Sequence, residues 1–254
     1  MVGSKRLLAV IPARGGSKRL PRKNVLDLAG KPLIAWTIQE ALNCKYIDQV
    51  IVSTDDKEIS DISKEYGADV PFFRPSELAT DEAKTVDVVL HLLDELEKVG
   101  ERYDYIILLQ PTSPLRTAQN IDESVELLQM KNSDAVISVC ESEHPPLWCN
   151  VLPDDMSMDN FLDESVKNKR SQDLSKQYRI NGAIYISSVK KLKKENAMKW
   201  LDNPKLASDI PNGTYIEQPF GKQSSPDLIV KENDIVFFIE AKSVDKNAKP
   251  LYNS

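Results

Sequence analysis

The order of strands and helices along residues 1–140 constrains the fold of this chain more than any other feature. Residues 7–11, Leu-Leu-Ala-Val-Ile, form a continuous apolar run, which is typical of a strand buried on both faces of a sheet. Further strands are predicted at residues 49–54, 105–109 and 134–140, and helices after Pro32, from Asp55-Asp56 to Gly67, and at residues 85–99 and 119–131. This alternation predicts an α/β fold with a doubly wound, mainly parallel sheet and right-handed crossovers.

The pattern changes after residue 140. Residues 141–178 contain prolines and many charges without a clear period, so we expect an insertion or a dimerisation arm that contacts a second subunit. A strand at 183–187 and a lysine-rich helix from Val189 restore the α/β pattern. A second change of character near residue 197 predicts one domain over residues 1–197 and an atypical tail with a β-hairpin over residues 198–254.

Composition and charge exclude several classes of protein. The chain contains no run of about 18 apolar residues, the length of a spanning helix, and its N-terminal apolar run is too short for a signal peptide. Cys44, Cys140 and Cys149 lack metal-ligand spacing, which favours a reduced, cytoplasmic protein. His91 and His144 are the only histidines, so histidine-based catalysis is not favoured. The net charge of −6 argues against a general nucleic-acid-binding protein.

A cationic loop follows the first predicted strand. Residues 11–24 read Ile-Pro-Ala-Arg-Gly-Gly-Ser-Lys-Arg-Leu-Pro-Arg-Lys-Asn, with cations at Arg14, Lys18, Arg19, Arg22 and Lys23. The backbone N–H groups of Gly15, Gly16 and Ser17 can approach an anion closely, and the carboxyl end of a parallel strand is where such sheets bind ligands. Neither the P-loop spacing nor the G-x-G-x-x-G spacing is present. The loop is therefore predicted to bind a triphosphate, with a solvated surface loop as the alternative.

Four sequence blocks together resemble a known family. Besides residues 11–24 they are 74–81 (Arg-Pro-Ser-Glu-Leu-Ala-Thr-Asp), 108–116 (Leu-Leu-Gln-Pro-Thr-Ser-Pro-Leu-Arg) and 178–185 (Tyr-Arg-Ile-Asn-Gly-Ala-Ile-Tyr). In this order they resemble the acylneuraminate cytidylyltransferases, the CMP-sialic acid synthetases. That family transfers CMP from CTP to the anomeric hydroxyl of a nine-carbon keto-sugar acid and releases pyrophosphate. The resemblance implies a Rossmann-like nucleotidyltransferase fold, a homodimer and Mg²⁺ as cofactor, with sialic, legionaminic or pseudaminic acid as the sugar acid.

The resemblance also implies roles for individual residues. Arg14 and Lys23 would be catalytic, because they would neutralise the triphosphate and the departing pyrophosphate. The implied nucleotide-binding residues, in addition to those of the glycine-containing loop, are Asn24, Arg74, Ala83 and Thr85. The implied sugar-acid-binding residues are Gln110, Arg170, Arg179 and Asn181. The two arginines would meet the sugar carboxylate, within one chain or across a dimer. Arg74 as a simple loop cation, Gln110 as a buried turn residue and Arg170 as part of a solvated face remain alternatives.

One element of the family pattern is missing near the C-terminus. The family ends in Ser-Ile/Val-Asp-Ile-Asp, whose paired aspartates hold the metal, whereas the nearest string here is Ser-Val-Asp-Lys-Asn at residues 243–247. We interpret that string as a coincidental similarity, with Asp245 as a substitute metal ligand only if the tail folds back over the sheet. The missing pair predicts impaired turnover, and a catalytically inactive nucleotide-binding dimer is an alternative.

The tail itself resembles the core of PD-(D/E)xK restriction endonucleases. Pro-Asp at Asp227, an apolar hairpin and Glu-x-Lys at Glu240 and Lys242 carry this resemblance. With a two-residue turn at 233–234, the two carboxylates would face each other and could bind Mg²⁺ for DNA cleavage. The tail's net charge of −1 gives it no basic surface for DNA. A natural fusion, a frameshift and an artificial chimera would each explain such a tail.

Overall fold

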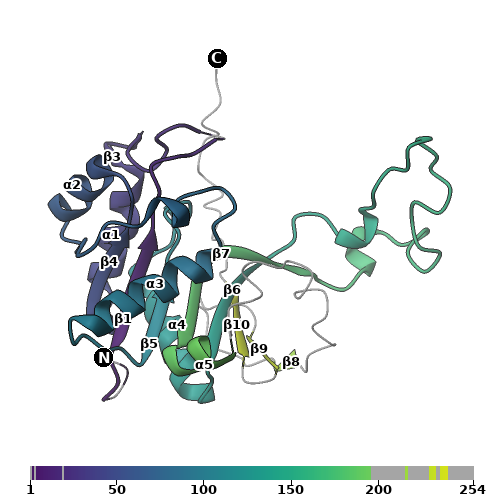
Figure 1. Ribbon diagram of the computed structural model, residues 1–254. Helices are drawn as coiled ribbons and strands as arrows, with labels where there is room; N and C mark the ends of the chain where they lie inside the picture. Colours follow the sequence, from purple (N-terminus) through teal and green to yellow (C-terminus); the bar gives the residue numbers. More distant parts are fainter. Residues whose placement is uncertain are drawn as a thin grey trace.

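The computed structural model describes residues 2, 4–18, 20–195, 215–216, 229–232 and 235–239 (Figure 1). Within these residues one eight-stranded sheet has the order β4-β1-β5-β7-β6-β10-β9-β8. Its strands are β1 (Leu7–Pro12), β4 (Gln49–Ser53), β5 (Tyr105–Leu108), β6 (Ala135–Glu141), β7 (Tyr178–Ser188), β8 (Tyr215–Ile216), β9 (Ile229–Glu232) and β10 (Ile235–Ile239). A separate two-stranded ribbon consists of β2 (Asp27–Leu28) and β3 (Lys31–Pro32).

Helices cover both faces of the sheet, as predicted for a doubly wound fold. The helices are α1 (Leu33–Asn43), α2 (Lys57–Glu65), α3 (Thr85–Lys98), α4 (Ala118–Lys131) and α5 (Val189–Glu195), with 3₁₀ turns η1 (Ser76–Leu78), η2 (Pro146–Trp148) and η3 (Ser171–Asp173). Residues of α1, α2 and α4 belong to one hydrophobic cluster, and residues of α3 and α5 belong to the other. None of the described helices is both long enough and apolar enough to cross a bilayer.

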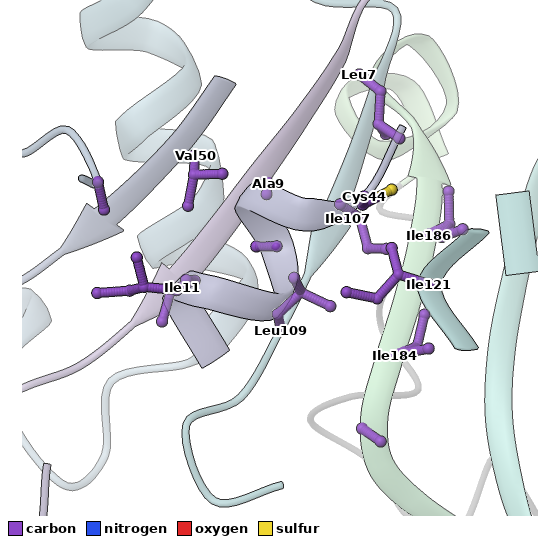
Figure 2. Packing of buried hydrophobic residues seen from close by; sticks show 14 of the residues in the cluster. Leu7, Ala9, Ile11, Cys44, Val50, Ile107, Leu109, Ile121, Ile184 and Ile186 are labelled. Carbon is purple, nitrogen blue, oxygen red and sulfur yellow. The ribbon is translucent and has the colours of Figure 1, made fainter. Parts of the chain in front are cut away.

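The apolar first strand contributes to both clusters because side chains alternate along a strand. Leu7, Ala9 and Ile11 face the cluster with α1 and α4, whereas Leu8 and Val10 face α3. All five side chains are fully buried. Figure 2 shows part of the first cluster, in which residues of β1, β5, β7 and α4 come together. The prediction of a strand buried on both faces is confirmed.

Local signals in the sequence set the ends of α2. The carboxylate of Asp56 accepts a hydrogen bond from the N–H of Ile59 at 3.0 Å and so caps the first turn. The chain leaves the helix through Gly67, whose φ of +93° lies in the left-handed region that glycine adopts without strain. The predicted helix from Asp56 to Gly67 is therefore confirmed, with its last helical residue at Glu65.

The strand β7 departs from a simple parallel alternation. It is longer than the predicted strand at 183–187, and it pairs antiparallel with both β5 and β6. The cause is the connection between β6 and β7, which contains no crossover helix. The chain leaves β6 at its carboxyl end, runs through residues 142–177 and returns into β7 at the same end, so β7 must run in the opposite direction.

Residues 142–177 form an arm that projects away from the sheet (Figure 1). The arm contains η2 and η3 and little other regular structure. Several of its apolar side chains are exposed: Leu147, Val151, Leu152, Met156 and Met158. Trp148 is half-buried on the arm. This geometry agrees with the expected arm, whereas its contact with a second subunit remains a prediction.

The C-terminal hairpin has the register that a two-residue turn predicts. Ile235 pairs with Glu232 and Phe238 with Ile229, and β10 also pairs parallel with β6. The proposed nuclease residues Asp227, Glu240 and Lys242 lie outside the described residues, as does Asp245. The endonuclease alternative and the division of the chain at residue 197 therefore stay predictions.

Candidate active site

A cleft of about 280 Å³ lies beyond the carboxyl ends of β1 and β5. The chain passes from β1 to β4 on one side of the sheet and later to β5 on the other, so this is the topological switch point where open α/β sheets bind ligands. Of the sequence-predicted site residues, the cleft brings together Arg14, Lys23, Asn24, Arg74, Ala83, Thr85 and Gln110. It is also lined by Pro12, Leu78, Thr80, Asp81, Val88, Pro111 and Thr112.

The cationic loop is attached to the end of β4 by acidic residues. The N–H of Gly15 donates to Asp55 Oδ1 at 3.0 Å, and Arg22 pairs with Asp56 at 3.2 Å. A Cβ at Gly15 would lie 2.6 Å from Asp56 Oδ2, so only glycine fits between the loop and this carboxylate. Arg22 also pairs with Glu58, which directs its side chain toward α2. These contacts fix the loop at the edge of the sheet, and the ion pairs of Arg22 help to hold it there.

Two cations of the loop share one carboxylate. Arg14 pairs with Asp81, and Lys18 Nζ lies 2.6 Å from the second oxygen of the same side chain. Hydrogen bonds from Lys18 and Arg14 hold the pKa of Asp81 below its usual value. Lys23 lines the cleft, and no carboxylate of the described residues forms an ion pair with it. Arg19 lies outside the described residues. Among the described cations of the loop, Lys23 is therefore the one best placed to meet an incoming anion.

Arg74 is a buried cation rather than a solvated loop residue. Its side chain donates to Ser53 Oγ at 3.1 Å and to the backbone oxygen of the same residue. Burial lowers its pKa to about 10, so it stays charged at neutral pH. With the guanidinium fixed against the end of β4, Arg74 presents a preorganised positive charge in the wall of the cleft.

Asn24 contributes an acceptor to the same cleft. Its side-chain nitrogen donates to the backbone oxygen of Arg14 at 3.1 Å. Its Oδ1 atom is buried and has no hydrogen-bond partner among the described residues. A buried acceptor without a donor is costly, and a bound hydroxyl or amino group would satisfy it. Asn24 is therefore suited to a nucleoside rather than to phosphate oxygens, which are acceptors themselves.

The predicted sugar-acid residues are not all brought together by one chain. Gln110 lines the cleft directly after β5. Arg170 is exposed on the arm and pairs with Asp173 at 2.9 Å, and Arg179 is exposed on β7. The Oδ1 atom of Asn181 accepts hydrogen bonds from Ser138 on β6 and from the N–H of Ala183 on β7. Arg170, Arg179 and Asn181 are not part of the cleft wall of this chain.

Asp81 is a residue of the cleft wall that the sequence reasoning did not single out. It is the last residue of the block at 74–81, so its position was known but its contacts were not. The contacts depend on how the connection between α2 and α3 folds against the cationic loop, over 60 residues earlier. The block itself was the available signal, because the resemblance already assigns residues 74–81 to nucleotide recognition.

Replacing Asp81 with asparagine is expected to strengthen CTP binding. The carboxylate occupies Arg14 and Lys18 in the free protein and must give them up to a phosphate. Because the pair is partly exposed, the gain should be modest, about twofold to fivefold in affinity measured by isothermal titration without metal. An Asp61→Asn variant, which removes a carboxylate that pairs with Lys57 on α2, should leave the affinity unchanged. Weaker CTP binding by Asp81→Asn would show that the carboxylate assists the nucleotide instead of competing with it.

The comparisons with known proteins agree with this geometry. Residues 8–211 match the family model described as cytidylyltransferase. The chain is 39% identical over 222 residues to CMP-N,N′-diacetyllegionaminic acid synthase of Legionella pneumophila, covering 84% of this chain and 92% of that protein. It is 38% identical over 183 residues to pseudaminic acid cytidylyltransferase of Campylobacter jejuni, covering 72% of this chain and 78% of that protein. The fold is similar to that of CMP:2-keto-3-deoxy-manno-octonic acid synthetase complexed with CTP, with a TM-score of 0.57 and 20% identity over 79% of this chain and 84% of that chain. The chain therefore belongs to the cytidylyltransferase family.

Proposed function

We propose that this protein transfers CMP from CTP to a nonulosonic acid and releases pyrophosphate. The observation that carries the proposal is the cleft itself, in which Lys23 and Arg14 lie at one wall with Arg74, Asn24 and Gln110 around them. Relatives with 39% and 38% identity are named for this reaction with legionaminic and pseudaminic acid. The resemblance to sialic acid enzymes adds a third candidate acid of the same class.

The residues of the cleft would act by positioning and charge neutralisation. The hydroxyl oxygen of the sugar acid attacks the α-phosphorus of CTP, the bond from that phosphorus to the bridging oxygen breaks, and the hydroxyl proton is released. Negative charge moves onto the departing pyrophosphate during this step. Lys23 and Arg14 would neutralise that charge, and a preorganised cation in a partly dry cleft is most effective at this task. Gln110 would hydrogen-bond the sugar acid at the wall of the cleft that follows β5.

Recognition of the nucleoside would fall to Asn24 and to the loop at residues 74–85. The unpartnered Oδ1 of Asn24 can accept from a ribose hydroxyl or from the amino group of cytosine. Arg74, Ala83 and Thr85 line the adjacent wall, where a guanidinium can donate to the carbonyl and ring nitrogen of cytosine. CTP should therefore be preferred over UTP, whose base lacks the amino group.

The residues present fit Mg²⁺ that arrives on the triphosphate. The described residues contain no cluster of three metal-ligating side chains, and Asp81 is the one carboxylate among the lining residues. Mg²⁺ is commonly held by one or two carboxylates together with substrate phosphates and water. Asp81 would supply that carboxylate once the phosphates take over Arg14 and Lys18. When bound, the ion would neutralise charge on the triphosphate.

A homodimer would complete the sugar-acid end of the site. Arg170 on the arm and Arg179 on β7 are exposed cations that this chain's own cleft does not use. The arm also exposes the apolar side chains named above. A second copy would cover this apolar surface and could bring a guanidinium to the carboxylate of the sugar acid.

A pyrophosphate-release assay tests the proposed function. The full chain is incubated with CTP, Mg²⁺ and sialic, legionaminic or pseudaminic acid, and the CMP-sugar acid is identified by mass spectrometry. We expect release with at least one acid, little with UTP, and loss of release when EDTA is added. CTP binding without release with all three acids would favour the alternative of a catalytically inactive nucleotide-binding protein.

A further inference from the structure

The pairing of β6 with β7 is interrupted at Ser138. The flanking pairs in the register are Ile137 with Tyr185 and Val139 with Ile180. A single β6 residue therefore faces residues 181–184 of β7, and the extra β7 residues form a bulge. Bulges redirect side chains and often occur beside functional sites. This bulge lies on β7, which is the neighbour of β5 in the sheet. The cleft residue Gln110 follows β5 along the chain.

Side chains replace the strand hydrogen bonds that the bulge removes. Ser138 Oγ accepts a hydrogen bond from the N–H of Ile184 at 2.7 Å and donates one to Asn181 Oδ1 at 2.6 Å. The same Asn181 Oδ1 accepts from the N–H of Ala183 at 3.0 Å. Ser138 has no exposed surface, so water does not compete for its hydroxyl. A single buried hydroxyl therefore joins both ends of the bulge.

The bulge lies directly against Gln110. Gly182 has a φ of +77°, and a Cβ at this position would lie 3.0 Å from Gln110 Oε1. Arg116 donates to the backbone oxygen of Ala183 at 2.8 Å and to the backbone oxygen of Gln110 at 3.3 Å. The bulge thus limits the side chain of Gln110 on one side and is connected to its backbone through Arg116.

We propose that Ser138 is a positioning residue for the sugar-acid end of the cleft, because its hydroxyl fixes the bulge against which Gln110 lies. The inference rests on the proposed function, in which Gln110 hydrogen-bonds the sugar acid. Ser138 does not line the cleft, so it acts through Gln110. The nucleotide end of the cleft consists of the cationic loop and residues 74–85. None of the hydrogen bonds described above connects the bulge to these residues. Loss of the hydroxyl should therefore impair the use of the sugar acid and spare the use of CTP.

The test compares Ser138→Ala with the wild-type protein by steady-state kinetics with each substrate varied in turn. A buried N–H that loses its acceptor relaxes toward other partners, so the bulge and Gly182 should shift. We expect the KM for the sugar acid to rise about tenfold and the KM for CTP to stay within about twofold. Ser138→Thr keeps the hydroxyl and should restore most of the affinity for the sugar acid. An equal rise in both KM values would overturn the proposal.

A matched control separates positioning from loss of stability. Ser187 is also fully buried, but its hydroxyl donates to the neighbouring Ser188 oxygen at 3.3 Å, away from the bulge. Ser187→Ala should leave both KM values unchanged. If Ser138→Ala yields too little folded protein, Gly182→Ala tests the same contact from the other side. Alanine at the φ of +77° strains the bulge, and its Cβ would lie 3.0 Å from Gln110 Oε1, so both effects should shift Gln110 and raise the KM for the sugar acid selectively.

A double-mutant cycle tests whether Ser138 acts through Gln110. In a Gln110→Ala background, Ser138→Ala should change the KM for the sugar acid by less than about twofold, because the side chain that it positions is gone. Additive effects of the two substitutions would reject the proposed link. The wild-type measurement distinguishes the two proposals. If the wild type transfers no cytidylyl group to any of the acids, the proposed function is refuted. If the wild type is active and Ser138→Ala has the same KM for the sugar acid, only this inference is refuted.

Discussion

The Lys23→Ala variant is expected to lose nearly all cytidylyl transfer, with kcat reduced about 10²-fold to 10³-fold. Lys23 lines the cleft without a carboxylate partner among the described residues, whereas Arg14 shares Asp81 with Lys18. Its charge is thus available in full for the leaving pyrophosphate. An interaction that strengthens as this charge develops affects kcat more than substrate binding. The measurement is pyrophosphate release at saturating CTP and sugar acid.

Two comparisons make the Lys23 experiment specific. Lys57→Ala removes an 82% exposed cation that pairs with Asp61 on α2, and it should leave kcat unchanged. Lys23→Arg keeps the charge but changes its shape and reach, and it should retain an intermediate rate. Turnover of Lys23→Ala within about threefold of the wild type would contradict the assignment of this residue and, with it, the orientation of CTP in the cleft.

The second large effect is expected on stability, from Arg116→Met. Arg116 is 2% exposed, and its guanidinium donates to Thr37 Oγ1 at 2.9 Å and to the backbone oxygens of Ala183 and Gln110. It thereby joins α1, β7 and the loop after β5. Methionine fills similar space but leaves these buried acceptors without a donor, which should lower the free energy of unfolding by about 3 kcal/mol.

Urea denaturation monitored by circular dichroism measures the Arg116 effect. The control is Arg102→Met, because Arg102 is exposed on the loop before β5 and should change stability by less than about 0.5 kcal/mol. Because Arg116 also contacts the backbone of Gln110, the remaining folded Arg116→Met protein should bind the sugar acid more weakly. A stability equal to that of the wild type would show that the surrounding acceptors find other donors.

Much of this fold follows from local sequence patterns. The apolar run at 7–11 predicts a strand buried on both faces, and Asp56 and Gly67 mark the ends of a helix, because each of these signals depends on neighbouring residues only. The position of the cationic loop at the cleft was also predictable, since the carboxyl ends of parallel strands share one edge of the sheet. The direction of β7 was not, because it depends on the path of an irregular arm.

The parts of the site that sequence reasoning missed are contacts between distant segments. Asp81 meets Arg14 and Lys18 only after the connection between α2 and α3 folds toward the end of β1. The contact of Asn181 with the sugar acid stays a prediction, and the structure adds that its Oδ1 accepts from Ser138 on β6 and from the N–H of Ala183. The block at 178–185 identifies the residue but carries no information about its partner on β6. Such pairings depend on strand register, which the resemblance alone does not specify.

The placement of β7 has a consequence for the order in which the protein folds during synthesis. The first 110 residues contain β1, β4 and β5, which are neighbours in the sheet and can pair as they leave the ribosome. The next strand, β6, has no partner among them, because β7 lies between β5 and β6. Its apolar residues therefore stay unpaired until translation has passed residue 188, the end of β7. The nascent chain is expected to be most prone to aggregation in this interval, and most dependent on chaperones.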